Sequence, residues 1–296
     1  MRYILTEEFN LKHTLECGQF FRWKNINDVY YIHNRDAFFN VYQDGAKLFY
    51  EGVDGNFIKR FFSLDENLPH IINTFNKDKY ISEAVRLYRG LRIIRQDPWE
   101  CTVSFILSAA SNIPRITKNL EDISRLFGKK VSLNGVSSYS IPAPGAIRDE
   151  KRMRENKLGF RSKFIVAAEE MALDGILDRI KGMPYREAEE LIMTIPGIAE
   201  KVADCILLFS YGYMEAFPVD TWIRKIMTEL YFDGKKVPDK KIREFATKYF
   251  GRYVGYAQEY LYIYTRNHWD RIRELRGRQF NSVEPAVFSN VAAGRL

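Results

Sequence analysis

The sequence predicts an α+β protein in which an N-terminal antiparallel β-sheet domain packs on an all-helical domain. Residues 1–75 contain short aromatic and β-branched runs between turn residues, a pattern typical of strands. From about Tyr80 onward, apolar residues recur at helical spacing. A chain of 296 residues is long enough for two domains with a sizeable core. We place the sheet domain at residues 1–78, the helical domain at 79–280 and a C-terminal tail at 281–296.

The strands of the first domain are expected to be short and antiparallel. The candidate runs are Phe20–Trp23, Val29–His33, Ala37–Gln43 and Lys47–Tyr50. Turn residues separate them at 25–28, 34–36 and 44–45, and such short connections favour antiparallel pairing. A short helix over Asn56–Phe62 is expected to follow.

The first helices of the second domain are marked by their start and stop signals. Tyr80–Ile94 carries an apolar face and is predicted to be a helix. Asp97, Pro98 and Glu100 form a strong helix start, with an N-cap acid, a proline at the first helical position and a glutamate three residues after the cap. We expect this helix to reach about Ala110.

A break and a long connection follow in the sequence. Ser111-Asn112-Ile113-Pro114 interrupts the chain and starts a helix that is expected to end at Gly128. Val131–Pro144 is rich in serine, glycine and proline, so we predict a loop there.

Later helices lead into and out of one stretch, Leu191–Asp220. One helix is expected from Arg161 to about Gly175, and Pro184 begins the helix that reaches the stretch. After the stretch, helices are predicted over roughly Thr221–Tyr231, Pro238–Tyr249 and Gly255–Arg276.

Charge and cysteine usage limit the classes of function. The net charge is +7 and the isoelectric point about 9.1, so the chain suits a polyanionic partner. Cys17, Cys101 and Cys205 are far apart and too few for a four-cysteine iron–sulfur cluster. We expect buried thiols in a reducing compartment, with no disulfide framework and no metal site. No segment approaches the roughly 20 apolar residues of a membrane span and no signal-peptide layout is visible, which predicts an intracellular protein.

The stretch Leu191–Asp220 contains a tight turn between two helices. The turn, Ile195–Ala199, is built around a Pro-Gly pair, and Gly197 allows a close backbone approach. Backbone N–H groups near Ala199 begin the next helix without intrahelical partners, and such groups suit a phosphate. The turn is therefore either a phosphate-binding hairpin or a plain connection between two helices.

Lys201 and Asp220 are the candidate catalytic pair of this stretch. Lys201 lies in the first turn after the hairpin, where the positive end of the helix dipole disfavours the ammonium form and favours a nucleophilic amine. The alternative is an ordinary surface lysine. Asp220 precedes a helix start and is expected to cap that helix, a role compatible with presenting a carboxylate to a cationic transition state.

A family resemblance becomes visible at this hairpin. Pro196–Phe209 (PGIAEKVADCILLF), followed by the FPVD of residues 217–220, resembles the signature of the helix-hairpin-helix glycosylase superfamily. Within that superfamily the chain resembles the 8-oxoguanine DNA glycosylases. The other segments that carry the likeness follow the family's order: Cys17–Trp23, Leu91–Cys101, Ser111–Thr117, Leu158–Phe164 and Gly255–Tyr262. The resemblance covers most of residues 10–265, and monofunctional relatives lack a lysine at the position of Lys201.

The resemblance implies a TBP-like sheet domain packed on a helix-hairpin-helix (HhH-GPD) glycosylase domain. It also implies a bifunctional enzyme, a monomer without cofactor or membrane, that excises 8-oxoguanine from double-stranded DNA. Lys201 would attack the sugar C1′, expel the base and hold the abasic sugar as a Schiff base, after which β-elimination would nick the strand. Asp220 would stabilise the cationic transition state. The hairpin amides at Gly197 and Ala199 would hold phosphate.

The resemblance further implies how the damaged base is read. The Gly18 carbonyl would accept a hydrogen bond from N7–H, which 8-oxoguanine has and guanine lacks. Gln258 would read the Watson–Crick edge. Cys205 and Tyr262 would stack on opposite faces of the flipped base.

Three residues would support the opened duplex. Phe160 would fill the hole left by the flipped base, and Arg115 and Arg161 would contact the orphaned cytosine. Ala110 stands where the family has an asparagine that bonds this cytosine, so we do not expect strict selectivity for cytosine, although Arg115 is retained.

Three other functions stay open at the level of sequence. A glycosylase of the same fold could act on other damaged purines, although Gly18 and Gln258 favour 8-oxoguanine. A non-catalytic DNA-binding module would use the hairpin for phosphates only, and Lys201 and Asp220 argue against it. A helical protein unrelated to DNA would show no salt-dependent binding to a duplex.

Overall fold

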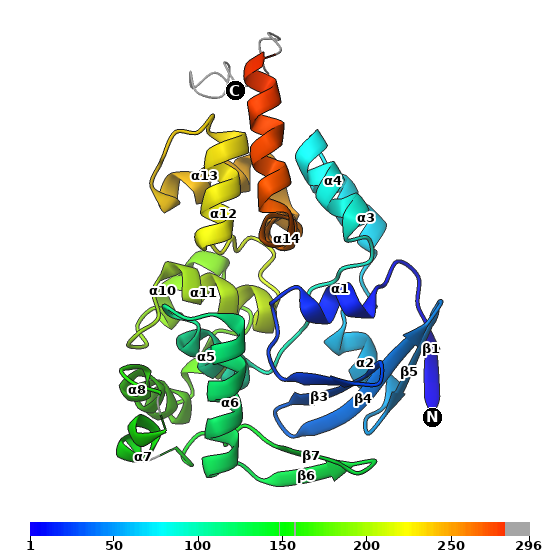
Figure 1. The fold of residues 1–296 in the computed structure, drawn as a ribbon. Coiled ribbons are helices and arrows are strands. Elements are labelled where there is room, and N and C mark those ends of the chain that lie inside the picture. Colours follow the sequence, from blue (N-terminus) through cyan, green and yellow to red (C-terminus); the bar gives the residue numbers. More distant parts are fainter. Residues whose placement is uncertain (148, 157, 282–296) are drawn as a thin grey trace.

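The computed structural model describes residues 1–147, 149–156 and 158–281. Within them the chain forms a five-stranded antiparallel sheet and a mostly helical body, so the predicted α+β fold class is confirmed (Figure 1). From position 282 onward, the tail predicted at 281–296 lies outside the described residues.

The sheet follows the predicted antiparallel arrangement. Its strands are β1 (Arg2–Leu5), β2 (Trp23–Ile26), β3 (Val29–Asn34), β4 (Ala37–Asp44) and β5 (Lys47–Glu51). Their spatial order is β1-β5-β4-β3-β2, and every neighbouring pair is antiparallel. The β2–β3 turn consists of Asn27 and Asp28, whose φ angles of 51° and 63° suit the twist of a tight hairpin. In the predicted strand Phe20–Trp23 only the last residue belongs to β2, because Phe20 and Phe21 turn into the hydrophobic cores.

Two helices complete the sheet layer. They are α1 (Leu11–Glu16) and α2 (Gly55–Phe61), and the second confirms the short helix expected near Asn56. Alternate residues of the central strands, such as Phe39 and Val41 on β4, are fully buried and share one core with Leu15 and Ile58 of these helices.

The helical body follows the sheet in sequence. It contains α3 (Leu68–Phe75), α4 (Lys79–Leu87), α5 (Pro98–Leu107), α6 (Ile113–Phe127), α7 (Glu150–Glu155), α8 (Arg161–Leu173), α9 (Ile176–Arg179), α10 (Tyr185–Ile192), α11 (Glu200–Ile206), α12 (Thr221–Ile226), α13 (Asp239–Phe250) and α14 (Val254–Asn281). Two π-helical turns, η1 (Leu207–Tyr211) and η2 (Met227–Tyr231), extend α11 and α12, and the 3₁₀ turn η3 (Gly251–Tyr253) joins α13 to α14. The predicted start at Asp97 is confirmed, since its side chain accepts the Glu100 N–H at 3.0 Å, although α5 ends at Leu107 rather than near Ala110.

The helix predicted over Tyr80–Ile94 is too long. α4 ends at Leu87, and Gly90 then takes a left-handed conformation with φ of +83°. Its carbonyl accepts the Asn10 N–H at 2.8 Å, and a Cβ at this position would lie 2.7 Å from the Asn10 nitrogen. The chain leaves the helix there because the backbone of the N-terminal segment packs directly against it, and residues 91–97 run on without helical structure.

The loop predicted over Val131–Pro144 contains a β-hairpin instead. β6 (Lys130–Leu133) pairs antiparallel with β7 (Val136–Tyr139). Asn134 and Gly135 form the turn with φ angles of 49° and 79°, the conformation for which an Asn-Gly pair is favoured. This two-residue signal is present in the sequence and specifies the hairpin.

Two hydrophobic cores divide the molecule. One lies between the sheet and its two helices, and the other fills the helical body. Leu68, Ile71 and Phe75 of α3 belong to the second core, although α3 precedes the boundary predicted at residue 78. The boundary itself stays a prediction. Within the described residues, no helix has both the length and the apolar character needed to cross a membrane.

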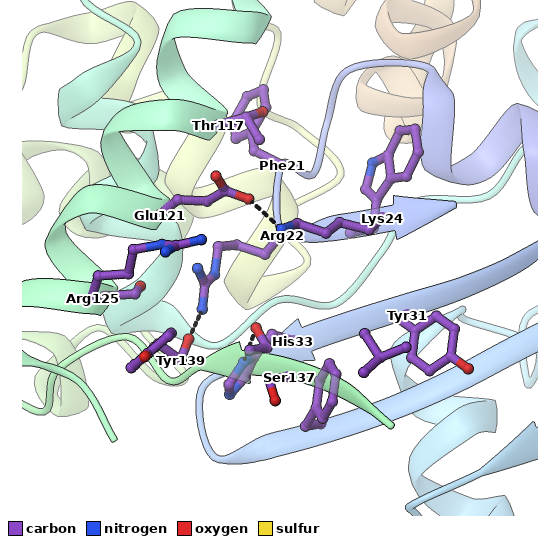
Figure 2. A pocket seen from close by; sticks show the side chains of 15 residues that line it. Phe21, Arg22, Lys24, Tyr31, His33, Thr117, Glu121, Arg125, Ser137 and Tyr139 are labelled. Atoms are coloured by element: carbon purple, nitrogen blue, oxygen red, sulfur yellow. Dashed lines mark hydrogen bonds and ion pairs between the residues drawn. The ribbon is translucent and has the colours of Figure 1, made fainter. Parts of the chain in front are cut away.

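A small hollow marks the junction between the sheet, α6 and the β6–β7 hairpin (Figure 2). It measures about 50 Å³, enough for a few water molecules. Arg22 donates a hydrogen bond to the Tyr139 carbonyl, and His33 Nδ1 lies 3.1 Å from Ser138 Oγ, so side chains tie the sheet to the hairpin across it. Burial and the Arg22 charge lower the pKa of His33 to about 3, which leaves this histidine neutral near pH 7. The hollow therefore lies where the sheet packs against the β6–β7 hairpin.

Candidate active site

A cleft of about 670 Å³ is lined by residues of α5, α6, α11, α12 and α14 and by the segment after α1. Its volume is in the range of ligand-binding pockets. Six predicted site residues line it: Gly18, Lys201, Cys205, Asp220, Gln258 and Tyr262. The fold therefore brings together the predicted catalytic pair and all four predicted base-recognition residues, although they are spread over most of the sequence.

Lys201 lies in the first turn of α11, as expected. Its Nζ donates a hydrogen bond to Ser108 Oγ at 3.2 Å and lies 5.4 Å from the centroid of the Phe105 ring. Both contacts come from α5 and its C-cap, so a second helix restrains the amine. The side chain is partly buried and faces the cleft, which distinguishes it from an ordinary surface lysine.

Asp220 is the N-cap of α12, as predicted. Its Oδ1 accepts the Ile223 N–H at 2.8 Å, and the residue is partly buried. Burial raises the pKa of the Asp220 carboxyl, against the opposing effects of the Ile223 amide and the Lys201 charge. The carboxylate thus caps the helix while sharing the cleft with the amine.

The predicted stacking residues come from two helices. Cys205 follows Lys201 by one turn of α11, so both side chains lie on the same face of that helix. Burial raises the pKa of the Cys205 thiol to about 12, so the thiol is neutral. All three cysteines are free and buried, so the expectation of buried thiols is confirmed. Tyr262 faces the cleft from α14.

Gln258 carries an unsatisfied acceptor in the cleft. The residue is 4% exposed, and its Nε2 donates to the Pro218 carbonyl at 3.3 Å. Its Oε1 is buried without a hydrogen-bond partner among the residues that the structure describes. Since buried polar atoms are normally paired, this oxygen is suited to accept a hydrogen bond from a ligand.

The predicted wedge and opposite-base residues lie apart from the cleft lining. Phe160, just before α8, is 51% exposed, as a side chain that enters a duplex would be. The Arg161 guanidinium carbon lies 4.6 Å from the centroid of this ring. Arg161 is itself buried and donates to the carbonyls of Ala109 and Ala110, so it supports the loop at the cleft edge. Arg115 is exposed in the first turn of α6.

The hairpin before α11 packs against α8. Gly197 has a φ of +87°, and a Cβ there would lie 2.5 Å from Cγ of Phe164, so only glycine fits this approach. Ala199 is the N-cap of α11 and offers no side-chain cap, which leaves the first-turn amides available. The phosphate-binding role of this hairpin stays a prediction.

Sequence reasoning missed three residues of the site. Ser108 contacts the amine, and Glu259 and Arg266 line the cleft. Burial raises the pKa of the Glu259 carboxyl to about 7. The helical period places Arg266 one turn after Tyr262, which was the available signal. In the described part of the chain, no group of three His, Cys, Asp or Glu side chains could hold a metal ion.

Comparisons with known proteins show which family the chain resembles. Residues 3–102 match the family model described as 8-oxoguanine DNA glycosylase, N-terminal domain. A probable N-glycosylase/DNA lyase of Methanothermobacter thermautotrophicus is 36% identical over 233 residues, which cover 69% of this chain and 73% of that relative. The apo-form of Clostridium acetobutylicum 8-oxoguanine glycosylase/lyase matches with a TM-score of 0.82 and 33% identity, covering 89% of this chain and 100% of that one. The same enzyme in complex with double-stranded DNA containing cytosine opposite 8-oxoguanine matches with a TM-score of 0.84 and 31% identity, covering 90% and 98% of the two chains.

These similarities extend over both parts of the molecule. The family model spans the sheet and reaches into α5, and the structural matches extend over the helical body that carries Lys201 and Asp220. The chain therefore belongs to the 8-oxoguanine DNA glycosylase family of the helix-hairpin-helix superfamily.

Proposed function

We propose that this protein flips 8-oxoguanine out of duplex DNA, excises it through a lysine Schiff base and nicks the abasic strand. The observation that carries the proposal is the single cleft in which Lys201 and Asp220 meet Gly18 and Gln258. A base inside a duplex is inaccessible at C1′, so it must be extruded at a cost of a few kcal/mol. The similarity to glycosylase/lyases supports both steps.

The chemistry requires a nucleophile and a stabilised positive charge. The neutral amine of Lys201 attacks C1′, and the base departs with the electron pair of the broken glycosidic bond. The Asp220 carboxylate stabilises the cationic character of the sugar during this step. Loss of a proton from nitrogen and opening of the sugar ring then give the Schiff base. Loss of a C2′ proton expels the 3′ phosphate, which nicks the strand.

Recognition of the base depends on one hydrogen bond that guanine cannot make. The Gly18 carbonyl accepts N7–H of 8-oxoguanine, whereas guanine presents a lone pair at N7 and leaves that carbonyl unpaired. Gln258 pairs with the Watson–Crick edge through its free Oε1. Cys205 and Tyr262 stack on the two faces of the base.

The DNA duplex is held by residues around the cleft. Phe160 occupies the space of the flipped base, with Arg115 and Arg161 next to the orphaned base. The amides at Gly197 and Ala199 bind phosphate, and the net charge of +7 makes affinity fall as salt rises. Since one chain supplies every residue of this site, we propose that the protein acts as a monomer on double-stranded DNA.

The excision rate should fall in acid, at a pH above the usual pKa of an aspartate side chain. Burial raises the pKa of Asp220, and the reaction needs its carboxylate, so activity is lost as pH falls through that raised value, above about 3.9. Single-turnover excision rates measured against pH would locate this acid limb. Glu259, whose pKa is raised to about 7, shares the cleft, so the Glu259→Gln variant is the control and should keep the limb. The Asp220→Asn variant separates this limb from the loss of the neutral amine in acid, because its residual activity should lack the Asp220 limb. An acid limb at or below about 3.9, one that persists unchanged in Asp220→Asn, or one that disappears in the Glu259 variant contradicts the assignment to Asp220.

The decisive test is cleavage of duplexes with 8-oxoguanine opposite each of the four bases. Excision and nicking are expected with cytosine, and measurable activity should remain with the other three bases because Ala110 offers no amide to the orphaned base. Borohydride should trap a covalent protein–DNA complex. A protein that binds abasic duplex but cleaves none of the substrates would be a DNA-binding module, and cleavage only of alkylated purines would indicate a different glycosylase.

A further inference from the structure

Arg266 connects the two parts of the cleft that are proposed to read the base. It belongs to α14, 249 residues after Cys17 in the sequence, and its Nη1 donates to the Cys17 carbonyl at 2.6 Å. Its Nη2 donates to the Glu16 carbonyl at 2.8 Å. The guanidinium carbon also lies 5.5 Å from the centroid of the Tyr262 ring, one helical turn earlier. One side chain therefore contacts the segment before Gly18 and the ring proposed to stack on the base.

The Glu16 and Cys17 carbonyls are well suited to bind a guanidinium. Glu16 is the last residue of α1 and Cys17 is its C-cap, so their carbonyls lack partners within the helix and lie at its negative end. The planar guanidinium binds both at once through two N–H groups, in a fixed geometry that a lysine ammonium does not reproduce. The end of α1 is thereby fixed relative to α14.

Gly18 follows Cys17 directly and is closely packed on all the sides where a Cβ would lie. Its φ is +110°, a conformation that favours glycine. A Cβ built there would lie 2.8 Å from Arg266 Nη1, 3.1 Å from Cδ1 of Ile113 and 3.2 Å from Cε1 of Tyr262. The backbone of Gly18 thus packs between the guanidinium and the ring, and the position of the guanidinium limits where the Gly18 peptide can lie.

Glu259 is a second residue of α14 that interacts with Cys17. It is 2% exposed, and the Cys17 thiol and Arg266 both oppose the burial that raises the pKa of its carboxyl. Its Oε1 is buried without a partner among the described residues. Arg266 and Glu259, both on α14, therefore both interact with Cys17, the residue before Gly18.

We propose that Arg266 is a positioning residue for lesion recognition, which sets the Gly18 carbonyl and the Tyr262 ring at the geometry that 8-oxoguanine requires. This inference depends on the proposed function. Discrimination between 8-oxoguanine and guanine rests on one hydrogen bond, and a displacement of about 1 Å at a reacting or reading group can cost roughly a hundredfold in rate. Loss of Arg266 should therefore weaken base excision, whereas chemistry at a sugar that has no base should not depend on it.

The test compares three substrates and three variants. Wild type, Arg266→Gln, Arg266→Lys and the control Arg271→Gln are assayed under single turnover on 8-oxoguanine:cytosine duplex and on duplex with a preformed abasic site. Arg271 lies on the same helix beyond its kink at His268 and is 55% exposed in its ion pair with Glu83. Its replacement by glutamine removes the same charge as Arg266→Gln. Binding of 8-oxoguanine:cytosine and guanine:cytosine duplexes is measured in the Lys201→Gln background.

The expected result is a selective loss. Arg266→Gln should lower the excision rate about tenfold to a hundredfold, with nicking of abasic duplex kept within about twofold, and should reduce the binding preference for 8-oxoguanine over guanine. Arg266→Lys should fall between, because it keeps the charge without the two-pronged contact. Arg271→Gln should match wild type on both substrates.

Other outcomes contradict the inference in distinguishable ways. An unchanged excision rate in Arg266→Gln shows that the guanidinium is not needed for recognition. A parallel loss on both substrates shows a role in the fold or in general DNA binding. If wild type nicks abasic duplex but leaves 8-oxoguanine in place, the proposed substrate is wrong, and the inference fails with it.

Discussion

Replacing Lys201 with glutamine is expected to abolish the covalent protein–DNA complex that borohydride traps and to lower strand nicking by a factor on the order of 10⁴. Glutamine has no amine that can attack C1′ or form a Schiff base. Glutamine keeps an unbranched polar side chain where the lysine amine lies 3.2 Å from Ser108 Oγ, so the local packing should persist. Gel analysis of lesion duplex after borohydride treatment measures the complex directly.

The matched control is Lys181→Gln. Lys181 is 64% exposed and pairs with Asp178 at the surface, so its loss removes the same charge without touching the cleft. This variant should form the covalent complex at the wild-type level. A complex that still forms in Lys201→Gln would show that another amine is the nucleophile, and the catalytic pair would have to be reassigned.

Much of the site could be predicted from the sequence because its signals are local. The Pro-Gly turn at 196–197 and the capping aspartates, Asp97 and Asp220, act within three or four residues of the chain, and each lies where the pattern placed it. Similarity to a known family supplied the more distant positions. Gly18 and Gln258 have no local signature that marks them as neighbours, yet they line one cleft.

What could not be predicted depends on contacts between distant segments. Leu91 and Ile94 continue the helical pattern of α4, but Gly90 must meet the Asn10 backbone, and that contact ends α4 early. The partners of Arg266 on α1 lie about 250 residues earlier, so no spacing rule reveals them. The β6–β7 hairpin is a different case, because its Asn-Gly signal is present but lies within a segment whose composition is typical of a loop.

Replacing Arg243 with methionine is expected to destabilise the protein by about 3–5 kcal/mol, because the change removes the ion pair of the fully buried Asp204 carboxylate. The Arg243 side chain on α13 is 12% exposed and pairs with Glu189 of α10 and, at 3.1 Å, with the fully buried Asp204 of α11. It also donates to Tyr185 Oη at 2.8 Å. Urea unfolding of the purified proteins measures the difference. The control is Arg224→Met, which breaks an exposed pair with Asp239 and should cost less than about 1 kcal/mol.

The pH dependence of the destabilisation by Arg243→Met identifies its cause. Burial raises the pKa of Asp204 to about 7, against the pull of Arg243, so the carboxyl is protonated in acid and charged above neutrality. The loss in Arg243→Met should therefore be smallest well below pH 7 and largest above it, where the unpaired charge must stay buried. A loss that is equal at both ends of this range would indicate lost packing of the arginine stem instead. Because Asp204 follows Lys201 by three residues on α11, the same ion pairs hold the helix that carries the proposed nucleophile.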